Sequence, residues 1–592
     1  MNLLPQLRDL LRPVLAPLVP DEAKLADYLA MIRPAQNADL GDYQANFAMP
    51  MAKALKRKPQ DVAADIIAGI PTNDLIESAA VAGPGFINIR LKNAALAAMV
   101  RATAADPHLG VAPAASPKTF VVDYSGPNVA KPLHVGHLRS TIIGEAICRL
   151  LRFLGHKVVG DNHLGDWGTQ FGMLLYGYKN LLDAESYKAD PVRELARMYR
   201  KVRELAKAND DDEAEKGNPI ADAYRAETVK LHEGDAENVA LWKQFMPACM
   251  EEVEAIYHRL DVHFDHQHGE SFYNEMLPGV VADLLEKGLA ERSEGAVIIR
   301  ESKDTVSLIQ KRDGAFTYTT TDLATIKYRV DTWNPRGMLY VVDFRQSDHF
   351  KNLFSAAKRW GYAGTEMTHV SFGSVLGEDG RPFQTRTGPT IELHTLLDKA
   401  VTLGLQKYEE SYKERQSRDE DLPVLGEAEK KQIAEVVGIG AVKYADLSQN
   451  RTSDYRFSFD KMLATDGNTA TYMQYAYARC RSIFRKGEID VEAFRSSLPD
   501  VIIESPYERA LALQLLRWNE ALDVAANEYM PHYLTTYLWD LSKAYSSFFV
   551  NCQVLKAESD ALRDSRLLLC DLTARVIRQT LHLLGIETVE RM

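Results

Sequence analysis

The chain has 592 residues and a formal net charge of −12 at pH 7, with 46% hydrophobic and 26% charged residues. This length predicts three or four domains of ordinary globular composition. No apolar stretch approaches the roughly 20 residues that span a bilayer, and the first 21 residues lack the pattern of a secretory signal. The five cysteines are scattered without a Cys-x-x-Cys pair. We therefore expect no structural zinc site or disulfide framework, and a reducing, cytoplasmic location.

Residues 1–112 are expected to form a separate α+β domain. Helical periodicity covers 3–18, 21–32 and 43–56, and a strand-like run follows at 86–91. A Pro/Ala-rich stretch at 111–117 has the composition of a linker between domains.

Residues 113–400 predict an α/β domain of the Rossmann-like type, with a doubly wound parallel sheet. The expected strands are 119–124, 157–161, 338–343 and 368–376, alternating with helical segments. A long, charged and mostly helical insertion at about 175–290 separates the two halves of this sheet.

Residues 401–592 predict an all-α bundle. In the last helix, Leu569, Leu572, Val576 and Leu583 share one face, and Gly585 provides a stop signal.

The most informative stretch is 123–137, Asp-Tyr-Ser-Gly-Pro-Asn-Val-Ala-Lys-Pro-Leu-His-Val-Gly-His. It follows a β-branched strand and leads into a helix, so His134 and His137 lie at a helix start, where anions bind. Gly136 allows a ligand to approach the backbone closely, and Lys131 adds a positive charge. The plainer alternatives are two surface histidines or half of a metal site.

Several motifs resemble the arginyl-tRNA synthetase family of class I aminoacyl-tRNA synthetases. His134-Val135-Gly136-His137 resembles the class signature, and residues 125–141 and 162–172 are similar to this family in particular. The resemblance continues in the first and last domains, and it covers nearly all of the chain. Its other segments are 37–44, 83–88, 467–479 and the Asp-Ala-Leu-Arg quartet at 560–563.

The resemblance implies an ATP-dependent ligase that forms arginyl-adenylate and transfers arginine to the terminal ribose of its tRNA. Its implied catalytic residues are His134, His137, Lys131 and Arg386. Its implied ATP contacts are His134, Gly136, His137, Lys131 and Thr385, with Mg²⁺ carried by ATP and no metal ligands from the protein.

The second class I signature, Lys-Met-Ser-Lys-Ser, is degenerate here. The matching segment reads Pro382-Phe383-Gln384-Thr385-Arg386 and contains no lysine. By resemblance, Lys131 and Arg386 would together replace the missing cationic clamp.

The substrate arginine carries a planar, always charged guanidinium, so its pocket requires anions. The positions that match the family's arginine contacts are Asp123, Asn128, Tyr318, Asp322 and Gln346. Tyr318 and Asp322 are four residues apart and would share a helix face. The alternative for Asp322 is an ordinary helix N-cap.

Binding of tRNA demands local basic groups, because the net charge is negative. The resemblance places tRNA contacts at Phe86 and Asn88 in the first domain; alternatively, Phe86 is a core residue. Arg479, Arg481 and Arg485 form a basic cluster in the helical domain that could equally be a solvated helix face. We expect a monomer with tRNA(Arg) and L-arginine as partners and without membrane contact.

Two other functions compete with this interpretation. A small-molecule nucleotidylyltransferase would share the strand and histidine pair but not the outer domains. A catalytically inactive tRNA-binding paralogue would account for the degenerate second signature.

Overall fold

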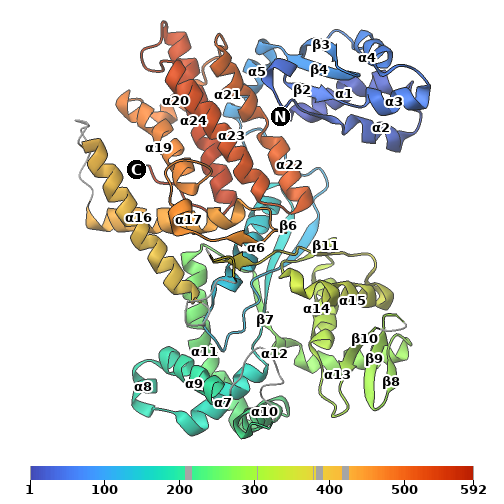
Figure 1. The fold of residues 1–592 in the computed structure, drawn as a ribbon, viewed down its shortest axis with the longest axis vertical. Helices are drawn as coiled ribbons and strands as arrows, with labels where there is room; N and C mark the ends of the chain where they lie inside the picture. Colours follow the sequence, from blue (N-terminus) through green and yellow to red (C-terminus); the bar gives the residue numbers. More distant parts are fainter. Residues whose placement is uncertain are drawn as a thin grey trace.

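A five-stranded parallel sheet lies near the middle of the molecule, and a helical bundle and an α+β module, which contain the C-terminus and the N-terminus, lie side by side at one end (Figure 1). The computed structural model describes residues 2–206, 217–302, 305–377, 379–381, 391–416 and 426–590.

The central sheet has the strand order β12-β11-β5-β6-β7 and all its pairings are parallel. Numbered along the chain within this sheet, the order is 5-4-1-2-3, the order of a Rossmann fold, which confirms the predicted fold class. The strands and the first crossover helix are β5 (Thr119–Asp123), α6 (Val135–Phe153), β6 (Lys157–Leu164), β7 (His266–Gly269), β11 (Gly337–Tyr340) and β12 (Glu366–His369).

The segment between β6 and β7 is helical, as expected, but the single insertion predicted at about 175–290 is interrupted, because β7 lies within it and pairs with β6 in the central sheet. Helices α8 to α11 start at side-chain caps such as Asn218, whose Oδ1 accepts hydrogen bonds from the first turn of α10. The helices are α7 (Thr169–Leu181), α8 (Ala184–Ala189), α9 (Pro191–Leu205), α10 (Pro219–His232) and α11 (Ala236–Arg259).

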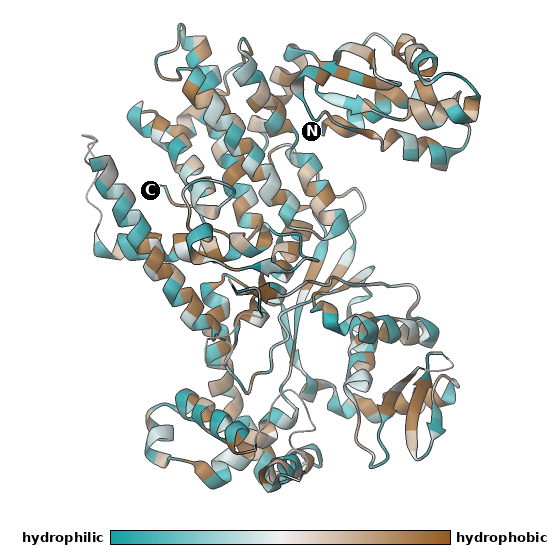
Figure 2. Cartoon of the chain, in the orientation of Figure 1, coloured by the Kyte–Doolittle hydropathy of each residue, from teal (hydrophilic) through white to brown (hydrophobic). Residues whose placement is uncertain are grey.

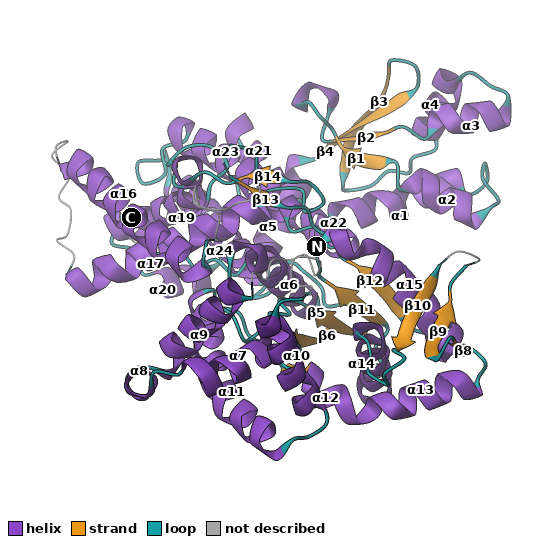
Figure 3. Cartoon of the chain, turned by 60° about the horizontal axis from the view of Figure 1, so that its bottom comes forward, coloured by secondary structure: helices purple, strands orange, loops and turns teal. Residues whose placement is uncertain are grey.

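A second excursion, between β7 and β11, carries a small antiparallel sheet that the sequence analysis did not anticipate. Figure 3 shows it apart from the central strands, beside α13 and α15. The elements are α12 (Glu270–Tyr273), α13 (Leu277–Glu286), β8 (Glu291–Ser293), β9 (Ala296–Arg300), β10 (Val306–Gln310), α14 (Tyr318–Trp333) and α15 (Ser347–Ala357). A π-helical turn, Lys358–Tyr362, follows α15, and short 3₁₀ turns occur at Ala38–Leu40, Asn274–Met276 and Phe344–Gln346.

The N-terminal module wraps helices around a four-stranded antiparallel sheet of order β1-β2-β4-β3. Its elements are α1 (Leu3–Leu15), α2 (Glu22–Leu29), β1 (Ile32–Pro34), β2 (Tyr43–Ala45), α3 (Ala48–Leu55), α4 (Pro59–Ala68), β3 (Ile76–Ala82), β4 (Phe86–Leu91) and α5 (Asn93–Ala105).

The C-terminal region is a helical bundle, as expected, and Figure 2 shows hydrophilic and hydrophobic residues alternating around its amphipathic helices. Its helices are α16 (Leu393–Gln416), α17 (Glu427–Leu447), α18 (Phe459–Met462), α19 (Ala470–Lys486), α20 (Val491–Ser497), α21 (Pro506–Leu516), α22 (Trp518–Glu528), α23 (His532–Asn551) and α24 (Asp560–Leu583). A two-stranded parallel pair, β13 (Val375–Leu376) and β14 (Tyr455–Arg456), joins the α/β region to the bundle.

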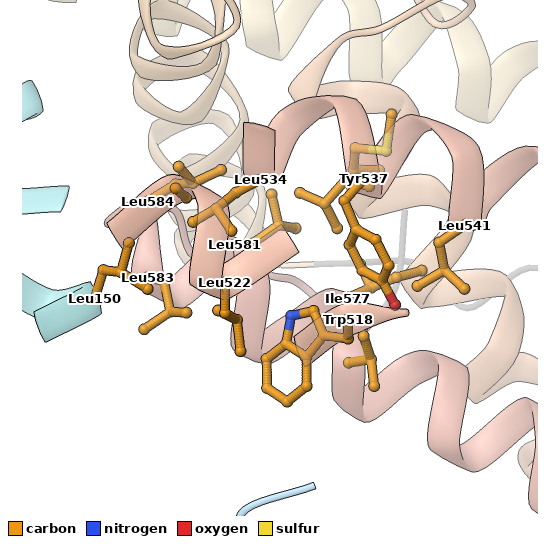
Figure 4. Packing of buried hydrophobic residues seen from close by; sticks show 14 of the residues in the cluster. Leu150, Trp518, Leu522, Leu534, Tyr537, Leu541, Ile577, Leu581, Leu583 and Leu584 are labelled. Atoms are coloured by element: carbon orange, nitrogen blue, oxygen red, sulfur yellow. The ribbon is translucent and has the colours of Figure 1, made fainter. Parts of the chain in front are cut away.

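The bundle core continues into the α/β domain. Figure 4 shows Leu150 of α6 beside Leu583, the last residue of α24, and Leu584, which follows it, with Trp518 and Leu522 of α22 close by. Helix α24 ends where predicted, since Gly585 takes the left-handed conformation with φ of 67°.

Two local predictions are wrong. The helix expected over 43–56 begins only at Ala48, because Tyr43 and Ala45 alternate into the core and pair with Ile89 and Ile87 as β2. The single strand expected at 368–376 is two short strands, β12 and β13.

Within the described residues, no helix is both long and apolar enough to cross a membrane.

Candidate active site

The candidate functional site is a cavity of about 690 Å³ at the carboxyl ends of β5 and β11. The strand order reverses between these two strands, and ligands of open α/β sheets bind in the crevice that forms there. Seven of the predicted site residues line this cavity: Asp123, His134, Gly136, His137, Tyr318, Asp322 and Gln346.

The two histidines form the start of α6. His134 is the N-cap, and its Nδ1 accepts a hydrogen bond from the Gly136 N–H at 3.1 Å. Its own N–H donates to Nδ1 of His137 at 3.1 Å, and the ring centroids lie 3.9 Å apart. A Cβ atom at position 136 would lie 2.8 Å from the His134 ring, so only glycine fits beneath this imidazole.

This arrangement decides which ring nitrogens carry protons. Burial, helped by His134 and Lys131 nearby, holds the pKa of His137 well below its usual range, so the ring is neutral at pH 7. Because Nδ1 accepts a hydrogen bond in both rings, we assign the proton to Nε2 in each. Two N–H donors therefore stand at a helix N-terminus, a combination suited to phosphate oxygens.

The part of the cavity lining that comes from α14 is acidic and aromatic. Tyr318 and Asp322 lie one turn apart on α14, as predicted, and Tyr318 is 67% exposed. Asp322 Oδ2 lies 2.7 Å from Nε2 of His349, whose ring contacts Tyr318 at 4.9 Å between centroids. The N-cap of α14 is Thr317, so the alternative that Asp322 caps this helix is wrong.

Asp123 at the end of β5 is held by a buried arginine that the sequence analysis missed. Arg329 of α14 is fully buried and pairs with Asp123 at 2.8 Å and with Asp161 of β6 at 2.9 Å. Burial raises the pKa of Asp123, and the Arg329 charge opposes this rise only in part. A signal for Arg329 existed, since it lies seven residues after Asp322 on the same helical face.

Glu270, at the start of α12, also lines the cavity and was missed. Burial raises the pKa of this carboxyl, and the neighbouring acids Asp166 and Asp322 add to the effect. Glu270 follows β7, whose sequence His-Gln-His-Gly contains no β-branched residue, and so the strand end that positions it was not recognised.

Two predicted residues lie beside the cavity rather than in its wall. Asn128 and Lys131 belong to the loop between β5 and α6, and both are half-buried. Asn128 Oδ1 accepts a hydrogen bond from the Ala130 N–H at 3.3 Å, and its backbone pairs with Gly165.

Thr385 and Arg386 lie outside the described residues. Nearby described residues do border the cavity: Ser374 and Val375 line it, and the Ile391 carbonyl accepts a hydrogen bond from the Val135 N–H at 3.2 Å.

The predicted tRNA contacts are far apart in the molecule. Phe86 and Asn88 are half-buried on β4, so Phe86 is not a core residue. In the bundle, Arg479 stacks on Tyr475 and Phe549 at 4.7 and 5.3 Å.

The other two predicted arginines already have acidic partners. Arg481 and Arg485 lie 3.2 and 3.8 Å from Glu590, and Arg481 lies 3.7 Å from Asp571.

In the described part of the chain, no cluster of three or more His, Cys, Asp or Glu side chains is arranged to hold a metal ion.

Three family models together match most of the chain. They are described as tRNA synthetases class I (R), catalytic domain, at residues 101–459; DALR anticodon binding domain, at 473–592; and Arginyl tRNA synthetase N terminal domain, at 5–91.

Curated relatives and solved structures are similar over nearly the full length. An arginine–tRNA ligase of Hahella chejuensis is 46% identical over 95% of this chain and 96% of its own. One of Rhodopirellula baltica is 43% identical over 96% and 97%. The arginyl-tRNA synthetase structure from Plasmodium falciparum has a TM-score of 0.81 at 28% identity, covering 99% of this chain and 98% of that one. The Thermus thermophilus arginyl-tRNA synthetase has a TM-score of 0.79 at 26% identity and covers all of both chains.

Proposed function

The chain belongs to the arginyl-tRNA synthetase family, and from this premise we propose how its cavity performs the two steps of the reaction. The enzyme joins arginine to tRNA(Arg) at the expense of ATP. In the first step, the arginine carboxylate attacks the α-phosphorus of ATP and pyrophosphate leaves. In the second, a hydroxyl of the terminal ribose of tRNA attacks the arginyl carbonyl and AMP leaves.

The nucleotide occupies the histidine side of the cavity. Nε2–H of His134 and of His137 donate to phosphate oxygens, where negative charge develops as pyrophosphate departs. Gly136 keeps the first turn of α6 open to the triphosphate. Since phosphoryl transfer needs little covalent help, these contacts act by orientation and charge stabilisation.

Arginine occupies the side formed by α14. Asp322 pairs with the substrate guanidinium and Tyr318 covers its alkyl stem, while Glu270 supplies a second, half-buried carboxylate that lines the same cavity. Asp123, Asn128 and Gln346 hold the amino and carboxylate end near the histidines. The observation that carries the proposal is that carboxylates and the two histidines line one and the same cavity.

Lys131, Thr385 and Arg386 complete the phosphate contacts in our proposal, with the two cations in place of the lysines of the second signature. Mg²⁺ enters on the ATP phosphates and neutralises part of their charge, and we assign no residue of the chain to it.

We further propose domain limits of 1–112, 113–400 and 401–592. The first domain contacts the tRNA elbow through Phe86 and Asn88, and the third contacts the anticodon region through Arg479, Arg481 and Arg485. We also propose that the protein is a monomer. The five cysteines are all free and buried, which supports a reducing cytoplasm.

The direct experiment is aminoacylation with purified tRNA and each of the twenty amino acids. Arginine alone should be attached. Attachment of another amino acid would contradict the assigned pocket, and tRNA binding without any attachment would instead favour the inactive paralogue. A His137→Ala variant should lower kcat about 100-fold with little change in the arginine KM, because its contacts strengthen in the transition state.

A further inference from the structure

The N-terminal module is docked on the helical bundle, although the Rossmann domain is the one that follows it in the chain. Figure 1 shows α5 beside α21, with the rest of the module at that end of the molecule. Arg575 of α24 donates to the carbonyls of Ala104 and Asp106 at 2.6 and 3.0 Å, which ties the end of α5 to the bundle. Two modules that are separated by the whole catalytic domain in sequence are therefore in contact.

The centre of this junction is a buried aspartate. Asp42 is 4% exposed, and its two carboxylate oxygens accept from the two Nη atoms of Arg509 at 2.7 and 2.8 Å. The Leu91 N–H donates to the same carboxylate at 2.7 Å, and Arg509 also donates to the Leu91 carbonyl at 2.8 Å. This bidentate pair fixes both the distance and the angle between the module and α21.

The next residue makes a second contact with the bundle. Tyr43 is fully buried, and its hydroxyl donates to Glu520 of α22 at 2.5 Å. The Arg517 guanidinium lies over the Tyr43 ring at 5.2 Å and donates to the Asp42 carbonyl at 2.5 Å. Asp42 and Tyr43 thus bind Arg509 of α21, Glu520 of α22 and Arg517, the residue between these two helices.

Glycine 41 makes this geometry possible. Its φ is +92°, and a Cβ atom there would lie 2.7 Å from the Ile89 carbonyl oxygen. The close approach lets the Asp42 N–H donate to that carbonyl at 2.8 Å, so the pair is presented from the edge of a rigid sheet. The Gly41-Asp42-Tyr43 segment lies within 37–44, one of the segments that resemble the family, and its contacts are with other parts of the same chain.

We propose that Asp42 and Tyr43, together with Arg509, Arg517 and Glu520, form a junction that positions the N-terminal module for tRNA. These are positioning residues, because they act through the orientation of Phe86 and Asn88 on β4 and touch no substrate. The inference rests on the proposed tRNA contacts of that module. A fixed orientation lets the module and the bundle bind one tRNA together, since two linked sites gain affinity only when the geometry permits both contacts.

The test is Arg509→Met in the full-length enzyme. The KM for tRNA should rise about tenfold or more, since the contribution of one of two linked sites is weakened. The kcat at saturating tRNA and the KM values for ATP and arginine should stay within about twofold, because the cavity lies in another domain. A merely structural defect would instead lower kcat in proportion to the folded fraction.

Arg101→Ala is the matched control. Arg101 of α5 pairs with Asp500 at the same junction at 3.2 Å, but the two side chains are 44% and 91% exposed. An exposed pair contributes little, so its tRNA KM should change less than about twofold. Should Arg509→Met fail to fold, Tyr43→Phe removes only the hydroxyl that binds Glu520 and should raise the tRNA KM in the same direction.

Phe86→Ala separates this inference from the proposed function. If Phe86→Ala raises the tRNA KM while Arg509→Met and Tyr43→Phe do not, the junction has no positioning role and the inference is overturned. If all three variants keep the parental tRNA KM, the tRNA contact of the module fails and the inference fails with it.

Discussion

The molecule contains two Asp–Arg pairs, Asp42–Arg509 at the junction and Asp123–Arg329 at the cavity, and the pKa values of their aspartates are shifted in opposite directions. At the junction, burial raises the pKa of Asp42, but hydrogen bonds from Arg509 and Leu91 outweigh it and the pKa is lowered. At the cavity, burial also raises the pKa of Asp123, and there Arg329 does not outweigh it. Arg329 pairs with two carboxylates, those of Asp123 and Asp161, whereas Arg509 pairs with one carboxylate, that of Asp42, and gives it two hydrogen bonds.

Both networks contain buried polar atoms without a hydrogen-bond partner. Within the described residues, these include Arg517 Nε at the junction and Asp161 Oδ1, Arg329 Nη1 and His163 Nδ1 in the α/β domain. Buried polar groups in native proteins are generally satisfied, and exceptions cluster at functional sites. Of these residues, His163 lines the cavity, which is consistent with a functional site there.

The largest effect is expected for Arg329→Met. This change leaves two buried carboxylates without their cation, and loss of one partner of a buried pair costs about 3–5 kcal/mol. The free energy of unfolding, from urea titration, should fall by that amount. Arg509→Met should cost less, since it leaves one carboxylate instead of two without its cation, and Asp42 keeps the hydrogen bond from the Leu91 N–H. Equal losses would contradict the distinction between the two pairs.

The next effect is on substrate recognition. Asp322→Asn removes the charge opposite the guanidinium, and a loss of about 3 kcal/mol corresponds to a rise of about 100-fold in the arginine KM. The KM for ATP should stay near the parental value, because the nucleotide contacts the other side of the cavity. Steady-state aminoacylation at varied arginine measures this, and unchanged arginine saturation would reject the role of Asp322.

A pH effect is expected at the junction. Burial raises the pKa of Glu520 to about 7 in spite of the Tyr43 hydrogen bond and the nearby Arg517 and Arg8, and Asp523 adds to the rise. The folded protein thus holds this proton more tightly than the unfolded chain. The stability that this tighter proton binding contributes is fully present below the unfolded pKa of about 4.3, and it is lost as the pH rises through the folded pKa of about 7.

Glu520→Gln should remove this slope and make the variant more stable than the parent at pH 8, by at most about 3 kcal/mol. Unfolding titrations at pH 5 and pH 8 test it. Parallel pH dependence of the two proteins would show that Glu520 is already ionised at neutral pH.

The smallest effect is expected for Arg101→Ala in stability measurements. Exposed pairs contribute about 0–1 kcal/mol, so the midpoint of unfolding should barely move. A loss comparable to that of Arg509→Met would mean that burial does not distinguish the contacts of the junction.

The sequence predicted the Rossmann core, the helical bundle and the histidine site because these depend on local patterns. A β-branched strand, a Pro- and Gly-rich loop and a helix start are adjacent in the chain, so the positions of His134 and His137 could be inferred. Tyr318 and Asp322 were placed on one helical face by their spacing alone.

The remaining features depend on contacts between distant segments. Tyr43 was assigned to a helix because its pairing with Ile89 is not local, and tertiary pairing overrode the helical pattern. Arg329 satisfies Asp123 and Asp161 only after two strands become neighbours in register. The contact of Asp42 with Arg509 spans 467 positions, and no periodicity in the sequence encodes it.

Helix α6 has a mechanical consequence. It begins at the histidines and, with 19 residues at 1.5 Å each, is about 28 Å long. Its far end is embedded among Trp518, Leu583 and Leu584 of the bundle (Figure 4). A helix of this length is stiff, and its far end is close-packed against the bundle. A tilt of the bundle when an anticodon docks would therefore move the imidazoles at the start of α6, because no loop lies between them and the bundle to absorb the motion.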